Sequence, residues 1–319
     1  YPIGRFILLW VFLFTSYSSY GQVLAEDEME YRLWYSGFDA RSSAMANANV
    51  ADPFDLNGLH TNPAIPVFSS NSPALISNSL YNPDRAVVLE NITVSLNRHT
   101  SHRLTGSATV QSSRLSENLV STPGQMQFTQ VDLTLGYSWL LFQTLSAGLA
   151  VHSLYGKTAT SEVLTHNASF GFLYAPSSLV SYGLVYRGTG IAENRLGAEP
   201  VYELTEESET IVTGIQAPHR LELGLTLRFP SLVRYPDFIL SLSNEKIFGV
   251  DGLIYRGGLE VNVQNFLALR GGYFFSPFAE GSRLGLGFLL DAFRLDYAFA
   301  PTSIDMTGKS HQISISLGF

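Results

Sequence analysis

The chain has 319 residues, of which 45% are hydrophobic and only 14% are charged, whereas charged residues make up about a quarter of an ordinary soluble domain. Its net charge of −8 argues against binding to nucleic acid, which needs a basic surface. Cysteine is absent, so disulfides, thiolate metal sites and cysteine nucleophiles are excluded. Beyond residue 20 no run reaches about 18 consecutive apolar residues, which excludes a membrane protein built from helices.

Residues 1–21 are typical of a signal peptide. Arg5 supplies the positive start, residues 6–14 form an apolar core, and Ser19-Tyr20-Gly21 places small residues where a signal peptidase cleaves. As a helix this core would be only about 14 Å long, too short to cross a hydrocarbon layer of roughly 30 Å. We therefore expect export and cleavage after Gly21 rather than a membrane anchor.

Residues 22–71 show no strand-like alternation and are expected to form a separate segment. Residues 37–51 (GFDARSSAMANANVA) are rich in small side chains, and turns are expected at Asp52-Pro53 and Asn62-Pro63. About fourteen strands follow, and a barrel of that size encloses a lumen that its own side chains cannot fill. We expect this segment to plug the lumen, with Asn62, Pro63 and Ala64 at the plug or ligand pocket and Asn62 satisfying backbone groups at a turn.

Residues 72–319 alternate between apolar and polar side chains with the period of a β-strand. In residues 220–228 (RLELGLTLR) every second residue is leucine. The expected strands span residues 72–81, 87–97, 102–111, 126–139, 143–156, 163–174, 179–188, 218–229, 236–244, 252–263, 265–275, 281–290, 292–299 and 311–319. An even number of strands returns the chain to the side on which it entered, as a bacterial outer-membrane barrel requires.

The connections support this strand count. Those after even-numbered strands are short, as periplasmic turns should be, and three of those after odd-numbered strands are long, at residues 112–125, 189–217 and 300–310. The longest is acidic, with Glu193, Glu199, Glu203, Glu206, Glu207 and Glu209. It is a candidate surface for a basic partner, although charge runs of this kind are usually only solvated.

A soluble β-sandwich or a lipocalin-like barrel would also alternate. Such folds need a charged outer surface, which this composition does not supply. Aromatic residues also gather near strand ends, as the interfacial girdles of membrane barrels require. They are Tyr137, Trp139, Phe172, Tyr174, Tyr186, Tyr273 and Phe274. The sequence therefore predicts an all-β, transmembrane antiparallel barrel of about fourteen strands in the outer membrane.

Alternation also places charged side chains on the luminal face of the strands. They are Asp132, Arg220, Glu222, Arg228, Glu260, Arg270, Arg283, Arg294 and Asp296. These charges could form an ion-pair network that holds the plug, or they could line a selectivity site for an anionic ligand. Their mixed signs favour the ion-pair network.

The sequence offers no catalytic or metal-binding motif. Of seven histidines only His152 lies in the middle of an expected strand, and a lone luminal histidine is usually a hydrogen-bonded filler. The HExxH, GxSxG and P-loop patterns are missing. We therefore expect no enzyme activity, no cofactor and no metal.

Both ends of the chain resemble the FadL superfamily. The segment ARSSAMANANVA followed by Asn62-Pro63-Ala64 is similar to the N-terminal signature of that superfamily, in which AMGGA precedes an Asn-Pro-Ala. This chain has Met45-Ala-Asn-Ala48 where the family has Met-Gly-Gly-Ala, and alanine and asparagine adopt fewer backbone conformations than glycine. The segments NFLALRGGY, RLGLGF and RLDYAFAP and residues 311–319 resemble the C-terminal strands of the PorV/PorQ group, and the terminal Phe319 resembles the signal read by the barrel insertion machinery.

The resemblance implies two different functions. A PorV/PorQ-like barrel would be an accessory component of type IX secretion, with secretion subunits or cargo proteins as partners. A FadL-like barrel would carry fatty acids or other hydrophobic molecules past its plug. The C-terminal segments favour the first function, and the modest loops argue against it.

Overall fold

The structure, a computed structural model, describes residues 39–68, 74–81, 87–95, 101–113, 129–157, 162–195, 219–230, 236–263, 266–277, 280–290, 293–300 and 310–317. The expected signal peptide, residues 22–38 of the N-terminal segment and the terminal Phe319 lie outside these residues.

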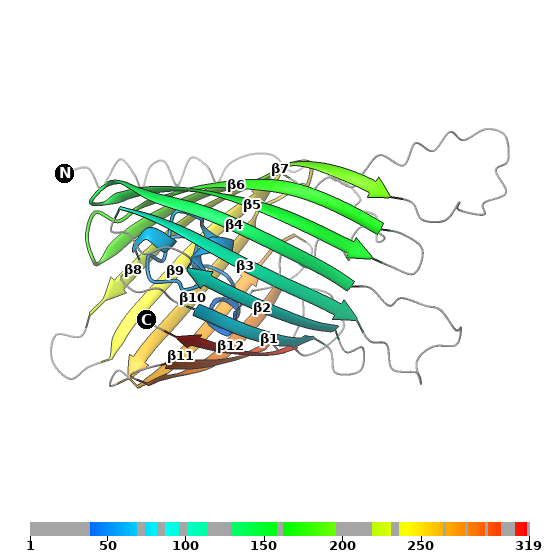
Figure 1. Ribbon diagram of the computed structural model, residues 1–319. Coiled ribbons are helices and arrows are strands. Elements are labelled where there is room, and N and C mark those ends of the chain that lie inside the picture. Colours follow the sequence, from blue (N-terminus) through cyan, green and yellow to red (C-terminus); the bar gives the residue numbers. More distant parts are fainter. Residues whose placement is uncertain are drawn as a thin grey trace, which may run out of the picture.

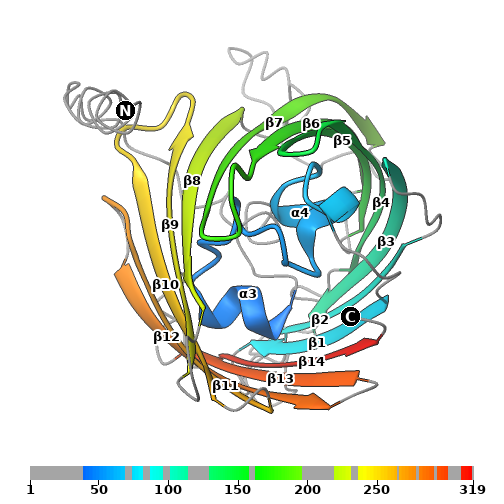
Figure 2. The same cartoon turned by 90° about the vertical axis from the view of Figure 1, so that its left-hand side faces the viewer.

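Fourteen antiparallel strands form one closed barrel. Figure 1 shows the barrel from the side, and Figure 2 shows it from one end. The strands are β1 (Ala74–Tyr81), β2 (Val87–Ser95), β3 (His102–Ser113), β4 (Thr129–Phe142), β5 (Leu145–Lys157), β6 (Glu162–Tyr174), β7 (Val180–Arg195), β8 (Arg220–Phe229), β9 (Asp237–Ile247), β10 (Ile254–Val263), β11 (Leu267–Phe275), β12 (Glu280–Leu290), β13 (Phe293–Ala300) and β14 (Ser310–Leu317). Each strand pairs with its sequence neighbours, and β1 pairs with β14 from Ala74↔Leu317 to Tyr81↔Ser310. The predicted fold class is confirmed, and the two-sheet sandwich is excluded.

The sequence predicts that the seventh strand ends at residue 188, before a loop over residues 189–217, and this boundary is wrong. In the structure Gly188 has a φ of 109° and lies in a bulge, where the pairing of β7 with β6 shifts register between Ala168 and Ser169. Strand β7 continues beyond the bulge to Arg195, so Glu193 belongs to a strand and not to the acidic loop.

The outer wall of the barrel is apolar and exposed. Leu133 and Leu135 are 56% and 52% exposed, while Asp132 and Thr134, which alternate with them, are buried. Exposed aromatic side chains lie at both rims, with Tyr137 and Tyr174 at the end with short turns and Tyr155 and Tyr273 at the other end. One expected girdle residue does not belong there, because Phe274 is buried on the luminal face while its neighbour Tyr273 faces outward.

The lumen contains the segment 39–68, called the inner segment below. It holds two short α-helices, α3 (Ala40–Ala44) and α4 (Gly58–Thr61), and the 3-10 helix η1 (Pro66–Phe68). Seen along the barrel, α3 lies near β11–β14 and α4 lies on the opposite side of the ring (Figure 2). Within the described ranges no helix is long and apolar enough to cross a membrane.

The purified protein should require detergent and should show β-rich circular dichroism, because its outer wall exposes apolar side chains. On a gel the unheated protein should migrate differently from the boiled protein, since a closed barrel resists unfolding by detergent. A monomer that stays soluble without detergent would contradict this prediction.

Candidate functional site inside the barrel

The inner segment lies closer to the wall than side chains would allow. A Cβ added to Gly183 would lie 2.2 Å from the carbonyl oxygen of Val50, and one added to Gly148 would lie 2.1 Å from that of Pro63. Real Cβ atoms do not approach other atoms so closely, so only glycine fits at these positions. At eight wall glycines an added Cβ would come within 3 Å of a backbone or side-chain atom of the inner segment. They are Gly136, Gly148, Gly171, Gly183, Gly224, Gly258, Gly272 and Gly285, called the glycine track below.

Small residues of the inner segment match this track. The backbone at Met45 and Ala46 lies against Gly258 and Gly272, and the Ala44 side chain lies against Gly285. Ala44 is fully buried beside Ala40 and Ala298. The run of small residues in the sequence therefore corresponds to close backbone packing on the wall.

Asn62 forms hydrogen bonds that join the inner segment to itself and to the wall. Its side-chain amide donates to the carbonyl oxygens of Val50 at 2.9 Å and of Phe172 at 3.0 Å, and its Oδ1 accepts from the amide of Ala64 at 3.0 Å. The turn is therefore held by three backbone groups, and Asn62 is fully buried. Wall hydroxyls add two further contacts, since Ser146 donates to the carbonyl of Ala64 at 2.8 Å and Ser181 to that of Ala51 at 2.5 Å.

Ala46 and Asn47 occupy the positions where the resembling family has two glycines. Their φ angles are 54° and 58°, in the left-handed region that favours glycine. An alanine there costs on the order of 1 kcal/mol. Ala46 therefore carries backbone strain that a glycine at this position would not.

The inner segment has a polar core around Asp55. The Asp55 carboxylate accepts from Asn49 at 2.6 Å and from Thr61 at 2.7 Å, and Arg41 lies 3.9 Å away. Arg41 forms a shorter ion pair with Asp52, at 2.6 Å. Burial, together with the charge of Asp39, raises the pKa of Asp55 to about 7 despite the nearby Arg41.

Two networks of ion pairs line the wall, and the first binds the inner segment directly. Glu260 accepts from Arg41 at 2.8 Å and from Arg270 at 2.6 Å. Asp296 pairs with Arg270 and with Arg294, each at 2.8 Å. Four of the luminal charges expected from alternation thus meet around one arginine of the inner segment, and burial of these charges is compensated by their partners.

The second network lies on β7–β10. Glu222 pairs with Arg187 at 2.9 Å and with Arg256 at 3.4 Å, and Glu245 pairs with Arg256 at 2.5 Å and with Arg220 at 3.3 Å. Arg187 also donates to the carbonyl oxygens of His60 and Thr61, so this network too contacts the inner segment.

Sequence reasoning missed three members of the second network. Glu245 lies just beyond the predicted end of its strand at residue 244. Alternation alone would have found Arg187, which follows Ser181 and Val185 on the luminal face of its predicted strand. It would also have found Arg256, which shares the luminal face with Glu260.

Two further expected charges, Arg228 and Arg283, contact aromatic rings. Arg228 is 30% exposed, lies 3.7 Å from Asp237, and stacks over the Phe54 ring of the inner segment. Arg283 lies over the ring of Phe274.

His152 is not the lone luminal histidine that the sequence suggested. His60 of α4 lies beside it, with the ring centroids 6.2 Å apart, and Asp132 lies 3.6 Å from its Nδ1. His152 also contacts the Thr134 hydroxyl at 2.9 Å. Burial lowers the pKa of His60 to about 3, so its ring is neutral at ordinary pH. Alternation finds the wall residues of this group but not His60, which belongs to the non-periodic inner segment.

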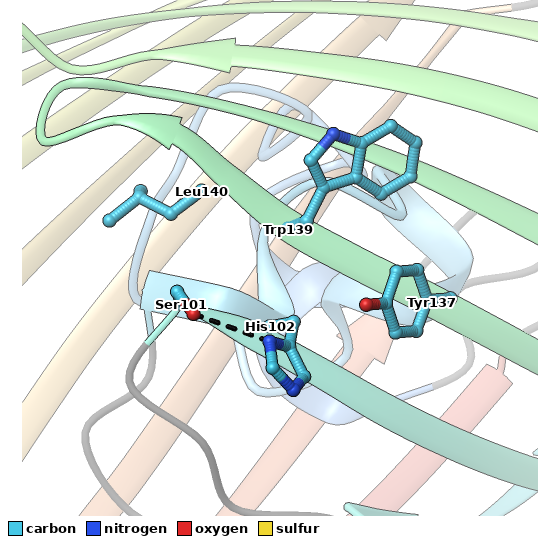
Figure 3. A pocket seen from close by; sticks show the side chains of 5 residues that line it. All are labelled: Ser101, His102, Tyr137, Trp139 and Leu140. Carbon is cyan, nitrogen blue, oxygen red and sulfur yellow. Dashed lines mark hydrogen bonds between the residues drawn. The ribbon is translucent and has the colours of Figure 1, made fainter.

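A depression lies on the outer wall (Figure 3). It is open and is lined by Ser101, His102, Tyr137, Trp139 and Leu140, at the start of β3 and the end of β4. The His102 ring stacks on Tyr137 with centroids 6.1 Å apart. Rings that combine an apolar body with a polar atom are typical of the interface between lipid and water. The depression therefore belongs to the rim of the outer wall and not to the lumen.

Several solved structures share the fold of this chain. No protein-family model matches the chain, and no curated protein is similar to it in sequence. The toluene transporter TodX of Pseudomonas putida matches with a TM-score of 0.59 at 12% identity, over 89% of this chain and 97% of TodX. The toluene transporter TbuX of Ralstonia pickettii matches with a TM-score of 0.61 at 9% identity, over 89% and 98%. A FadL homologue of Pseudomonas aeruginosa matches with a TM-score of 0.56 at 12% identity, over 89% and 99%.

Replacing Gly183 by valine should displace the inner segment, because the new Cβ would overlap the backbone of Val50. Since the chain has no cysteine, a Val67→Cys substitution in η1 provides a buried reporter. We expect Gly183→Val to raise its maleimide labelling rate at least about tenfold.

The matched control is Gly156→Val, also on the inner wall, where the nearest atom to an added Cβ is 3.6 Å away. Heat-dependent gel mobility shows that each barrel has folded. Equal labelling of the two variants would mean that the glycine track does not hold the inner segment.

The packing of the inner segment should weaken at alkaline pH. The folded pKa of Asp55 is about 7, above its ordinary 3.8, so its contribution is fully present below about pH 4 and is lost as the pH rises through 7. Labelling of Val67→Cys, measured relative to the unfolded protein at each pH, should rise between pH 5 and pH 8.5. Asp55→Asn should reduce this rise, and an unchanged rise would assign the effect to another group.

Proposed function

We propose that the protein is an outer-membrane channel for small apolar molecules, closed at rest by its inner segment. The observation that carries the proposal is a closed barrel with an exposed apolar wall, whose lumen is occupied by a part of the same chain. The apolar wall fits bilayer lipid, and the aromatic rims fit the two interfaces. A barrel that served only as an anchor would need fewer strands, since about eight already fill their own interior.

The contacts of the inner segment support a closure that can be reversed. They consist mainly of hydrogen bonds, ion pairs and close backbone packing, and water can replace the polar contacts when the segment moves. One apolar cluster also joins the segment to the wall, where Ala51, Ala64, Ile65 and Phe68 pack with Leu173. Movement of the segment would uncover this apolar surface, which favours an apolar solute over a sugar or an ion.

The similar solved structures support the same class of solute. Two are described as toluene transporters, and a deletion mutant of TodX is described as a monoaromatic hydrocarbon channel. At 9–12% identity they share the fold with this chain, and the transfer of their solutes to it is part of our proposal.

A role in type IX secretion is the second candidate. It is favoured by the C-terminal resemblance to the PorV/PorQ group and by the tight fit of the inner segment, since a protein-binding barrel can stay closed. The solved structures described above give it no support.

Expression in Gram-negative cells that lack a channel for hydrophobic compounds tests the proposal. The wild-type protein should fractionate with the outer membrane and should speed the uptake of labelled toluene or oleate several-fold over an empty vector, without admitting a labelled sugar. A variant without residues 39–64 should admit the sugar as well and should show a larger single-channel conductance in planar bilayers. Uptake equal to the empty vector, with secretion subunits co-purifying from native membranes, would replace the channel by the second candidate.

A further inference from the structure

The inner segment and the barrel wall bring together two histidines and a carboxylate that lie far apart in the sequence. His60 lies on α4, Asp132 on β4 and His152 on β5, and one ligand atom from each lies within 4.8 Å of the others. All three residues are buried, with 6–8% of their surface exposed. We propose that this group, the His60 cluster, binds a divalent transition-metal ion of the Zn²⁺ class.

The residue types and their spacing fit such an ion. Imidazole nitrogen and carboxylate oxygen bind zinc at about 2.0–2.2 Å, so neighbouring ligand atoms of a tetrahedral site lie about 3.4 Å apart. The present separations of up to 4.8 Å need a contraction of roughly 1–1.5 Å, which side-chain rotation can supply. Two nitrogen donors favour Zn²⁺, Ni²⁺ or Cu²⁺ over Mg²⁺ and Ca²⁺, which prefer oxygen.

The wall also places hydroxyl groups beside the two imidazole rings. Thr134 is the register partner of Ser107 on β3 and of His152 on β5. The Ser107 hydroxyl lies 2.8 Å from Nε2 of His60, and the Ser169 hydroxyl lies 3.3 Å from Nε2 of His152. Such hydroxyls orient imidazole rings. The three residues of the cluster would supply three ligands of a tetrahedral ion, so a hydroxyl or a water could take the fourth coordination position.

The nearby charges permit a dication. Asp132 supplies a negative charge among the ligands. Arg187 is the positive group that acts on His60, but it pairs with Glu222 at 2.9 Å and donates to the carbonyl oxygens of His60 and Thr61. Its charge is therefore compensated by its own partners.

A metal at this cluster would join α4 to two strands of the wall. The inner segment would then be held by coordination bonds in addition to the glycine track and the ion pairs. This inference goes beyond the proposed channel and is independent of the solute.

The test is a Zn²⁺ titration of the folded, untagged chain in detergent, by calorimetry and by competition with a chromophoric chelator. We expect one tight site per chain, and at least about a hundredfold weaker binding for His60→Gln and for His152→Gln. The matched control is His166→Gln, because His166 is exposed on the outer wall, 3.0 Å from Ser153, and should leave the affinity unchanged. Heat-dependent gel mobility confirms that each variant is folded.

X-ray absorption at the zinc edge gives a second readout, and two imidazole nitrogens with oxygen ligands at about 2.0–2.1 Å are expected. The inference fails if no tight site exists, if His60→Gln and His152→Gln bind like the wild type, or if His166→Gln removes the binding. None of these measurements uses transport, so their failure would leave the proposed channel standing.

Discussion

The structure depends on the pairing of its first strand with its last. A strand with an unpaired edge cannot lie in hydrocarbon, because each unsatisfied amide or carbonyl there costs several kcal/mol. The register between β1 and β14 closes the sheet and removes both edges. Closure with fourteen strands also fixes a wide lumen. The barrel therefore needs something to fill it, and the chain supplies its own inner segment.

The inner segment fills the lumen by packing its backbone closely against the wall. Glycines on the wall leave room for main-chain atoms of the inner segment, and Asn62, Ser146 and Ser181 satisfy its polar groups. Large apolar side chains would fill the same space, but they would leave backbone groups without partners. The inner segment is thus bound by a surface that matches its backbone, while Ile65 and Phe68 pack beside Leu173.

The buried charges are also paired, either with opposite charges or with backbone groups. Glu260 of β10 binds Arg41, and Arg187 of β7 binds the backbone near His60, so the inner segment is attached to the wall at more than one strand. If one partner of such a pair is lost, the other charge stays buried without compensation, which is strongly destabilising. Movement of the inner segment would therefore have to let water enter both networks, which couples opening of the lumen to hydration of its walls.

The sequence by itself determined the barrel. A period of two is a local property, so strand number, the alternation of short and long connections, and the inward direction of residues such as Glu260 follow from it. Two strand ends escaped it, because β7 continues past the bulge at Gly188 to Arg195 and β9 continues past its predicted end to include Glu245.

Only the tertiary structure decided what the inner segment contacts. It has no period, and its small residues indicate close packing without naming the surface they pack on. The pairing of Val50 with Gly183, of Arg41 with Glu260 and of His60 with His152 joins residues more than ninety positions apart, within the described residues. Such contacts depend on the curvature of the closed wall and on the path of a non-repeating chain inside it, and neither is encoded in any local stretch of sequence.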